Sequence, residues 1–381
     1  MKNGPLSGLK ILEFVGIGPG PLAAMILSDL GADVLRIDRV VAGNLGVPRP
    51  VAFDFGGRGR PSLALDLKRP ESIDLVLDLV GRSDGLIEGF RPGVMERLGL
   101  GPDVCLKAKP DLAYGRLTGW GQTGPMAPLA GHDLNYIALT GALDMIGRSD
   151  SGPVPPLNII GDYAGGSLLM VIGILAAIHS ARQTGRGQVI DSAIVDGVAL
   201  MMTPLLGMMA SGSFNRGRGR NILDSGAPHY DTYICSDGLY LAVAPIEEKF
   251  RVLLLEGLGL DPATFPDVTD PANWAKARPI LAARIATRPR DEWAAIFAES
   301  DACVAPVLSA EESRSHPHLV ERGVYVKVGE HLQPAPAPRF SATPCDVPTP
   351  TVARGSSAEA LTGWGVSLGQ VETLRRAGAL L

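Results

Sequence analysis

The stretch LKILEFVGIGPGPLAAMILSDLGADVLRIDR, residues 9–39, constrains the fold more than any other part of the chain. Its apolar runs at residues 9–15 and 34–37 are typical of strands buried on both faces, and a glycine-rich loop and a helical pattern separate them. Pro21 lies where the first turn of a helix accepts proline. Similar signals follow in SLALDLK, in a helix over about residues 70–80, in DGLIEGFRPGV and in DLAYGRLTGWG. This alternation predicts an α/β fold with an open, mostly parallel sheet.

The remaining pattern divides the chain into a large and a small domain, as expected for 381 residues of which 46% are hydrophobic. Helical periodicity over residues 163–182 and 192–210 completes a large domain of residues 1–210. The periodicity is lost over residues 211–227, which predicts an exposed linker. Two β-rich runs around Ser236-Asp237-Gly238 then indicate a hairpin in a small α+β domain, residues 228–325.

Helical patterns over residues 247–257 and 279–300 complete the small domain. Residues 326–354 are rich in proline and predict an extended linker. Residues 355–381 form a C-terminal segment with a helix over about residues 368–379.

Composition narrows the classes of function. Charged residues make up 20% of the chain, the net charge is −5 and no basic block is present, which argues against a nucleic-acid-binding surface. The most apolar stretch, residues 168–178, is shorter than the roughly 20 residues that span a bilayer, and the N-terminal sequence lacks the layout of a signal peptide. We therefore expect a soluble cytoplasmic protein. No disulfide framework or metal site is expected, since the cysteines are scattered, at Cys105, Cys235, Cys303 and Cys345.

The glycine loop after the first strand imitates a dinucleotide-binding fingerprint in a Rossmann-like sheet. Gly16 and Gly18 lie between a strand and a helix, and Asp38 ends the next strand. The third glycine of that fingerprint falls at Pro21, where a proline prevents the close packing that glycine allows. Binding of a nicotinamide dinucleotide is therefore a weak hypothesis, which ranks third behind the two functions given below. A tight turn between strand and helix is the simpler interpretation of these glycines.

Four cations lie at or just beyond predicted strand ends: Arg39, Lys68, Arg91 and Arg97. Ligands of open α/β sheets gather at the carboxyl ends of the strands, and Arg and Lys are the usual partners of phosphate groups. Each cation alone is typical of a solvated surface. Together they favour an anionic ligand such as coenzyme A.

Several motifs of the chain resemble motifs of a known protein family. They include FRPGVMERLGLGPD, RLTGWGQTGP, AGHDLNYIALTGAL, PPLNIIGDYAGG, GQVIDSAIVDG and GAPHYDTYICSDGLYLAVAPIEEKF, in this order. With the first 39 residues they make the chain resemble the α-methylacyl-CoA racemases of the family III CoA-transferase superfamily. The likeness runs over nearly the whole chain; GHDLNY and GDYAGG are its most specific parts, and it is loosest at residues 40–62, 260–290 and the last 35.

The resemblance implies an interlocked homodimer in which each chain threads through its partner, with residues 355–381 returning to the large domain. It implies an acyl-CoA thioester as substrate, so that coenzyme A is part of the substrate and no separate cofactor is needed. It assigns the contacts to coenzyme A to the following residues: Arg39, Leu65, Asp66, Leu67, Lys68, Gly89, Arg91, Arg97 and the loop from His132 to Tyr136.

The resemblance also places a catalytic pair at His132 and Asp162, with Glu247 supporting the histidine. The implied activity interconverts (R)- and (S)-2-methylacyl-CoA thioesters by 1,1-proton transfer through an enolate. Such a racemase or epimerase needs a base on one face of the carbon and an acid on the other, and a histidine can serve as either near neutrality. If a helix begins near Asp133, its first N–H groups could stabilise the enolate oxygen, which makes Asp133 part of the expected catalytic site.

Each of these residues also has a structural interpretation. Asp133 and Asp162 are typical helix caps, His132 is compatible with a surface position, and an acid at Glu247 suits the start of a helix. The second alternative for function is an acyl-CoA:carboxylate CoA-transferase with Asp162 as nucleophile. A catalytically silent scaffold is a further alternative.

Overall fold

The structure is a computed structural model that describes residues 2–41, 43, 46–357 and 359–380. Two compact units make up the chain. The sheet unit consists of Met1–Thr140, Leu157–Met201 and Glu321–Leu381, and the small unit consists of Gly141–Pro156 and Met202–Val320.

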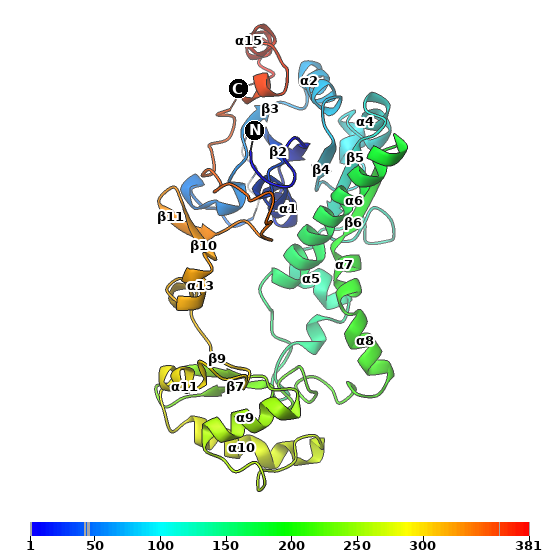
Figure 1. Cartoon of the computed structure of the whole chain (residues 1–381). Helices are drawn as coiled ribbons and strands as arrows, with labels where there is room; N and C mark the ends of the chain where they lie inside the picture. The colour runs from blue at the N-terminus through cyan, green and yellow to red at the C-terminus, as the bar shows by residue number, and fades with distance from the viewer. Residues whose placement is uncertain (1, 42, 44–45, 358, 381) are drawn as a thin grey trace. The chain divides into compact units, whose positions relative to one another are not determined.

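A six-stranded, all-parallel sheet forms the centre of the sheet unit (Figure 1), with the order β3-β2-β1-β4-β5-β6. The strands are β1 (Lys10–Phe14), β2 (Asp33–Arg39), β3 (Ser62–Leu65), β4 (Gly85–Glu88), β5 (Ala113–Thr118) and β6 (Gln188–Ala193). The prediction of an open parallel α/β sheet is confirmed. The strand order reverses between β1 and β4, so the loops after these two strands flank the switch point where ligands of such sheets bind.

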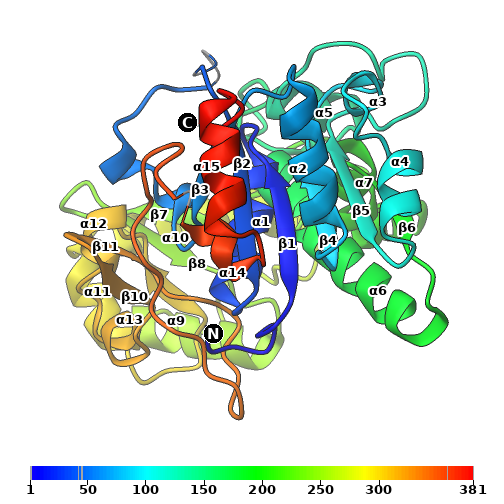
Figure 2. The same cartoon turned by 90° about the horizontal axis from the view of Figure 1, so that it is seen from above.

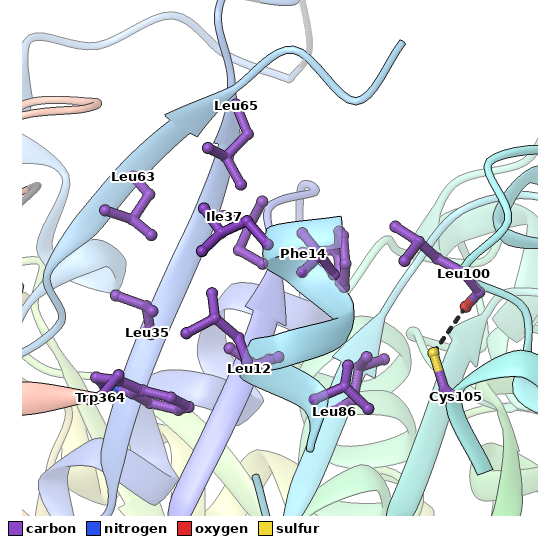
Figure 3. Packing of buried hydrophobic residues seen from close by; sticks show 14 of the residues in the cluster. Leu12, Phe14, Leu35, Ile37, Leu63, Leu65, Leu86, Leu100, Cys105 and Trp364 are labelled. Carbon is purple, nitrogen blue, oxygen red and sulfur yellow. Dashed lines mark hydrogen bonds between the residues drawn. The ribbon is translucent and has the colours of Figure 1, made fainter. Parts of the chain in front are cut away.

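One face of this sheet is buried by helices from both ends of the chain. Figure 3 shows apolar side chains of β1, β2, β3 and β4 packed in one layer with Trp364. Helix α2 (Pro70–Val80) has the predicted bounds, and α14 (Ala360–Gly363) and α15 (Leu368–Arg376) lie beside the same strands (Figure 2). A backbone bridge joins Leu65 to Leu380.

The opposite face carries α1 (Pro19–Asp29) and a long apolar helix. The latter starts as a π-helix, η4 (Ile159–Leu168), and continues as α6 (Leu169–Thr184). By length and composition alone, the helical stretch Ile159–Thr184 is long and apolar enough to cross a membrane. Half of its most apolar 18-residue segment is buried inside the fold. Its contacts with β5 and β6 make it a core helix of the sheet unit.

One helix prediction is wrong. Residues 192–210 are not one helix, because Ser192 and Ala193 end β6, and α7 (Ile194–Met201) and α8 (Thr203–Ala210) follow as separate helices. Strand β6 was not predicted, since it lies at the sheet edge and four of its six residues are not buried, which removes the apolar signal of a central strand. The second of the two helices, α8, has a proline, Pro204, in its first turn.

The small unit has its own antiparallel sheet, with the order β7-β8-β9. The predicted hairpin is confirmed as β7 (Asp231–Ile234) and β8 (Tyr240–Val243), and β9 is Val304–Pro306. Helix α9 (Glu248–Leu258) matches its prediction. Residues 279–300 are two helices, α10 (Trp274–Ile285) and α11 (Arg290–Phe297), because Pro289 breaks the pattern as the cap of α11.

The unit boundaries differ from the expected domain boundaries at residues 141–156 and 202–210, which belong to the small unit, as does the expected linker 211–227. Residues 321–325, expected in the small domain, belong to the sheet unit. Ion pairs from Arg148 to Asp231 and from Arg218 to Asp144 join residues 141–156 to the rest of the small unit. The remaining short helices are α3 (Val94–Arg97), α4 (Pro102–Ala108), α5 (Asp133–Leu139), α12 (Ala310–Ser313), α13 (Pro317–Glu321) and the 3-10 turns η1 (Val51–Phe53), η2 (Phe55–Gly57), η3 (Leu143–Met145) and η5 (Pro271–Asn273). Strands β10 (Tyr325–Val328) and β11 (His331–Pro334) form a further antiparallel pair.

Candidate active site

Asp162 lies in the π-helix η4, against the loop that follows β1. An ideal Cβ atom on Gly18 would lie 3.0 Å from Asp162 Oδ2, so only a glycine leaves the carboxylate this room. Gly18 has φ +67° and caps α1. Ser167, also in η4, donates from its hydroxyl to the carbonyl of Pro19 at 2.8 Å. These contacts hold the Asp162 carboxylate near the switch point of the sheet.

Asp133 fixes the backbone of Asp162. Its buried carboxylate accepts a hydrogen bond from the Asp162 N–H at 2.7 Å, between residues 29 positions apart in the chain. An ideal Cβ on Gly161 would lie 2.3 Å from the same Asp133 oxygen, so a glycine is required there. The predicted helix start is confirmed, since α5 begins at Asp133, but the Asp133 side chain reaches η4 and does not cap its own helix.

His132 is the N-cap residue of α5, and its side chain is exposed. Its backbone N–H donates to Asn135 Oδ1 at 3.0 Å, which holds the first turn of the helix. Burial raises the pKa of the Asp162 carboxyl, and the adjacent Asp133 raises it further. The Asn158 amide, which donates to Asp162 Oδ2 at 3.3 Å, and the charge of His132 lower it. His132 and Asp162, two predicted catalytic residues, are thus electrostatic neighbours.

Tyr136 supports the loop that carries His132. Its buried ring packs edge-on against Trp120 at a centroid distance of 4.7 Å, and its hydroxyl donates to the Gly131 carbonyl. Burial, followed by the charge of Asp162, raises the pKa of Tyr136 to about 12, while Arg91 opposes this shift. Tyr136 was predicted to contact coenzyme A, and in this structure its phenol is engaged within the loop.

The predicted phosphate-binding cations lie at the carboxyl edge of the sheet. Arg39 ends β2 beside Leu65, the end of β3, and its guanidinium lies 5.6 Å from the centre of the Phe90 ring. Gly89 and Arg91 follow β4, and Arg97 ends α3. Arg39, Lys68, Arg91 and Arg97 are all exposed and form no ion pair with another residue that the structure describes. This edge can therefore accept a phosphorylated ligand.

The turn after β3 offers mainly its backbone to such a ligand. Leu65 is buried, and Leu67 packs against the core of the sheet unit. The carboxylate of Asp66 accepts from the N–H of Lys68 at 3.1 Å and lies 3.7 Å from Arg69. The Lys68 ammonium is the exposed charge of this turn.

A partly buried ionic network, which the sequence did not predict, holds the loop after β4. Glu88 accepts from the N–H of Phe90 at 2.7 Å and from Arg116 Nε at 3.0 Å. Arg116 also donates to both carboxylate oxygens of Glu96, at 2.8 and 3.3 Å. Burial raises the pKa of Glu88 to about 7, against its hydrogen bond from Phe90 and the charge of Arg116. The network joins β4, β5 and α3, and thereby positions the segment that carries Arg91 and Arg97.

Glu247 belongs to the small unit, where it is the exposed N-cap residue of α9. Its carbonyl accepts the N–H groups of Phe250 and Arg251, at 3.2 and 3.1 Å. Its side-chain carboxylate interacts electrostatically with Cys303 and helps to raise the pKa of that thiol, which burial raises most. The structure thus brings together His132, Asp133 and Asp162, and it places Glu247 in the other unit.

Comparison with known proteins gives a consistent result. The α-methylacyl-CoA racemases of Mus musculus and Homo sapiens are 44% and 43% identical to the chain over 340 residues, which cover 89% of this chain and 87% of each relative. A CaiB/BaiF family protein from Brucella suis has a solved structure that matches with a TM-score of 0.81 and 27% identity, over 95% of this chain and 99% of that one. The family model described as CoA-transferase family III matches residues 6–355, and the chain belongs to this family.

Proposed function

We propose that this protein is an α-methylacyl-CoA racemase, which interconverts (R)- and (S)-2-methylacyl-CoA thioesters. The observation that carries the proposal is the linked pair His132 and Asp162, joined through the hydrogen bond of Asp133 and lying beside the switch point of the sheet. The relatives named α-methylacyl-CoA racemase support the assignment.

The reaction needs two proton-transfer groups, one on each face of the C2 carbon. One of the pair removes the C2 proton next to the thioester carbonyl and leaves a planar enolate. The other returns a proton to the opposite face, which gives the other enantiomer, and the two groups exchange roles in the reverse direction. The raised pKa of Asp162 makes its carboxylate a stronger base than an exposed one.

The enolate oxygen needs hydrogen-bond donors while its charge develops. The N–H groups of Asp133 and Leu134 at the start of α5 have no partner within the helix and lie at its positive end, whereas the N–H of Asn135 donates to the His132 carbonyl at 2.8 Å. A thioester oxygen held there would be stabilised, and one donor of this kind is typically worth about 3–4 kcal/mol in the transition state. In this proposal one loop supplies both a proton-transfer group and the oxyanion site.

The coenzyme A part of the substrate binds at the carboxyl edge of the sheet in this proposal. The exposed cations Arg39, Lys68, Arg91 and Arg97 pair with its phosphates, and Leu65, Asp66, Leu67 and Gly89 offer backbone contacts. The proposal needs no metal and no cofactor besides the substrate's own coenzyme A. Glu247 supports the His132 imidazole within an interlocked homodimer, and the protein acts in the cytoplasm, without nucleic acid and without insertion into a membrane.

A deuterium experiment tests the activity. A single enantiomer of a 2-methylacyl-CoA is incubated with the protein in deuterated water, and C2 exchange and optical purity are followed together. Exchange with racemisation in the absence of an acceptor acid is expected. Product formed only with a carboxylate acceptor would instead establish CoA transfer, the second candidate, in which Asp162 is the nucleophile; the description of the matching family as CoA-transferases supports keeping it.

A further inference from the structure

The loop after β5 carries the motif GWGQTG, to which the proposed reaction assigns no role. Its tryptophan, Trp120, is half-buried and packs edge-on against the ring of Tyr136, at a centroid distance of 4.7 Å and an interplanar angle of 85°. The Nε1 of Trp120 is buried and has no hydrogen-bond partner among the residues that the structure describes. A buried indole N–H usually finds a partner. The contacts of this side chain are therefore those of its apolar ring and not of its donor.

The rings of Trp120 and Tyr136 enclose the backbone just before His132. An ideal Cβ atom on Gly131 would lie 2.7 Å from the Tyr136 ring and 3.0 and 3.1 Å from two carbon atoms of the Trp120 indole. The Tyr136 hydroxyl donates to the carbonyl of the same glycine. An ideal Cβ on Gly119 would collide with the Tyr136 ring, so this ring also lies against the backbone next to Trp120. Gly131 is thus held between the indole and the phenol.

Trp120 is itself anchored to the sheet through the residues that follow it. The N–H of Gly121 donates to Oγ1 of Thr118, the last residue of β5, at 3.0 Å. The N–H of Gln122 donates to Oδ2 of Asp191 on β6, also at 3.0 Å. The indole therefore extends from a loop that two strands hold in place.

The segment that leads to His132, residues 128–132, has fewer attachments of its own. Within the part of the chain that the structure describes, its hydrogen bonds all remain within residues 126–136. Asp162, in contrast, is held through its backbone N–H and through the Asn158 amide, neither of which involves Trp120. A change at the indole should therefore displace His132 more than Asp162.

We propose that Trp120 is a positioning residue for His132: its indole sets the place of Gly131 and thereby the reach of the His132 imidazole toward the C2 carbon. The inference rests on the proposed racemase function. A proton-transfer group must come within about 3 Å of the atom with which it exchanges the proton, and a displacement of about 1 Å can cost a hundredfold in rate. Loss of the indole should therefore impair the step that His132 performs and spare the step that Asp162 performs.

Proton exchange measures the two steps separately. Each enantiomer of a 2-methylacyl-CoA is incubated in deuterated water with Trp120→Ala, and inversion at C2 and exchange with retention are followed for each. Inversion needs both groups, so its kcat should fall about a hundredfold in both directions while KM changes little. The enantiomer whose C2 proton faces Asp162 should still exchange that proton with retention at about the wild-type rate. The other enantiomer should lose exchange and inversion together.

A conservative variant, a control and a measurement without turnover complete the test. Trp120→Phe keeps an aromatic ring beside Tyr136 and should recover most of the inversion rate. Phe53→Ala is the matched control, because it removes an exposed ring that packs against His331 within the sheet unit, and it should change neither rate. Amide hydrogen exchange, followed by mass spectrometry, should become faster in residues 128–132 of Trp120→Ala and stay unchanged in η4.

The outcomes distinguish this inference from the function on which it rests. A wild-type protein that exchanges no C2 proton would overturn the racemase function and the role of Trp120 together. If the wild type racemises, the role of Trp120 alone is overturned by either of two results with Trp120→Ala. One is an equal loss of inversion and exchange for both enantiomers, and the other is no loss at all.

Discussion

At the scale of single residues, the carboxyl groups of Asp133 and Asp162 have different roles. Asp133 is buried and accepts a backbone N–H, so its charge is used to hold η4, whereas Asp162 is half-buried and directs its oxygens toward Gly18 and Asn158. Burial raises the pKa of both groups. We infer that Asp133 is a positioning residue and that Asp162 carries the proton.

Asp133→Ala should lower kcat for C2 exchange by about a hundredfold, since a displacement of about 1 Å at a reacting group can cost that much. KM should change little, because the cations proposed to bind coenzyme A lie elsewhere. Asp133→Asn retains an oxygen that accepts the Asp162 N–H, and it should restore most of the lost rate. The same loss of kcat in both variants would show that the charge of Asp133 matters and not its hydrogen bond.

The pH profile gives a second prediction at this scale. The raised pKa of Asp162 places the acid limb of kcat/KM above the range of an ordinary aspartate, because the base is lost as the pH falls through that pKa. Asn158→Ala removes a hydrogen bond that lowers this pKa and should move the limb to higher pH. A limb that stays in place, or that moves to lower pH, would assign it to another group.

At the scale of the elements, the network Glu88–Arg116–Glu96 connects two strands to a helix too short to hold its place alone. Helix α3 has four residues, and it ends with Arg97. Arg116 on β5 fixes it through Glu96, and Glu88 shapes the turn that presents Arg91. The cations proposed to bind the substrate are thus oriented by the residues around them.

Glu96→Ala should weaken the binding of coenzyme A about fivefold, the upper range for a partly exposed ion pair, and leave kcat unchanged. The matched control is Asp78→Ala on α2, which breaks the exposed ion pair with Arg82 and should leave the affinity as it is. Calorimetric titration with coenzyme A measures both. An unchanged dissociation constant in Glu96→Ala would separate the network from substrate binding.

At the scale of the whole molecule, the sequence predicted what short-range patterns encode. The buried strands β1 to β5, helix α2 and the β7–β8 hairpin all carry local apolar or turn signals. The edge strand β6 was missed, because an edge strand depends on pairing with its neighbour more than on an apolar run. The long helix was predicted over residues 163–182, but not its start at Ile159 or the π-helical geometry of η4, which a local periodic pattern does not encode. The same holds for the site: the start of α5 was predicted, whereas the hydrogen bond from Asp162 to Asp133 joins residues far apart in the chain.

The proposed interlocked homodimer makes a prediction that an ordinary dimer does not share. Two chains that thread through each other separate only if one unfolds, whereas a simple dimer dissociates on dilution by mass action. Two differently labelled samples, mixed under native conditions at nanomolar concentration, should therefore stay dimeric and exchange no subunits over days. Unfolding and refolding the mixture should produce mixed dimers, which serves as the positive control. Exchange within hours under native conditions would exclude the threaded arrangement.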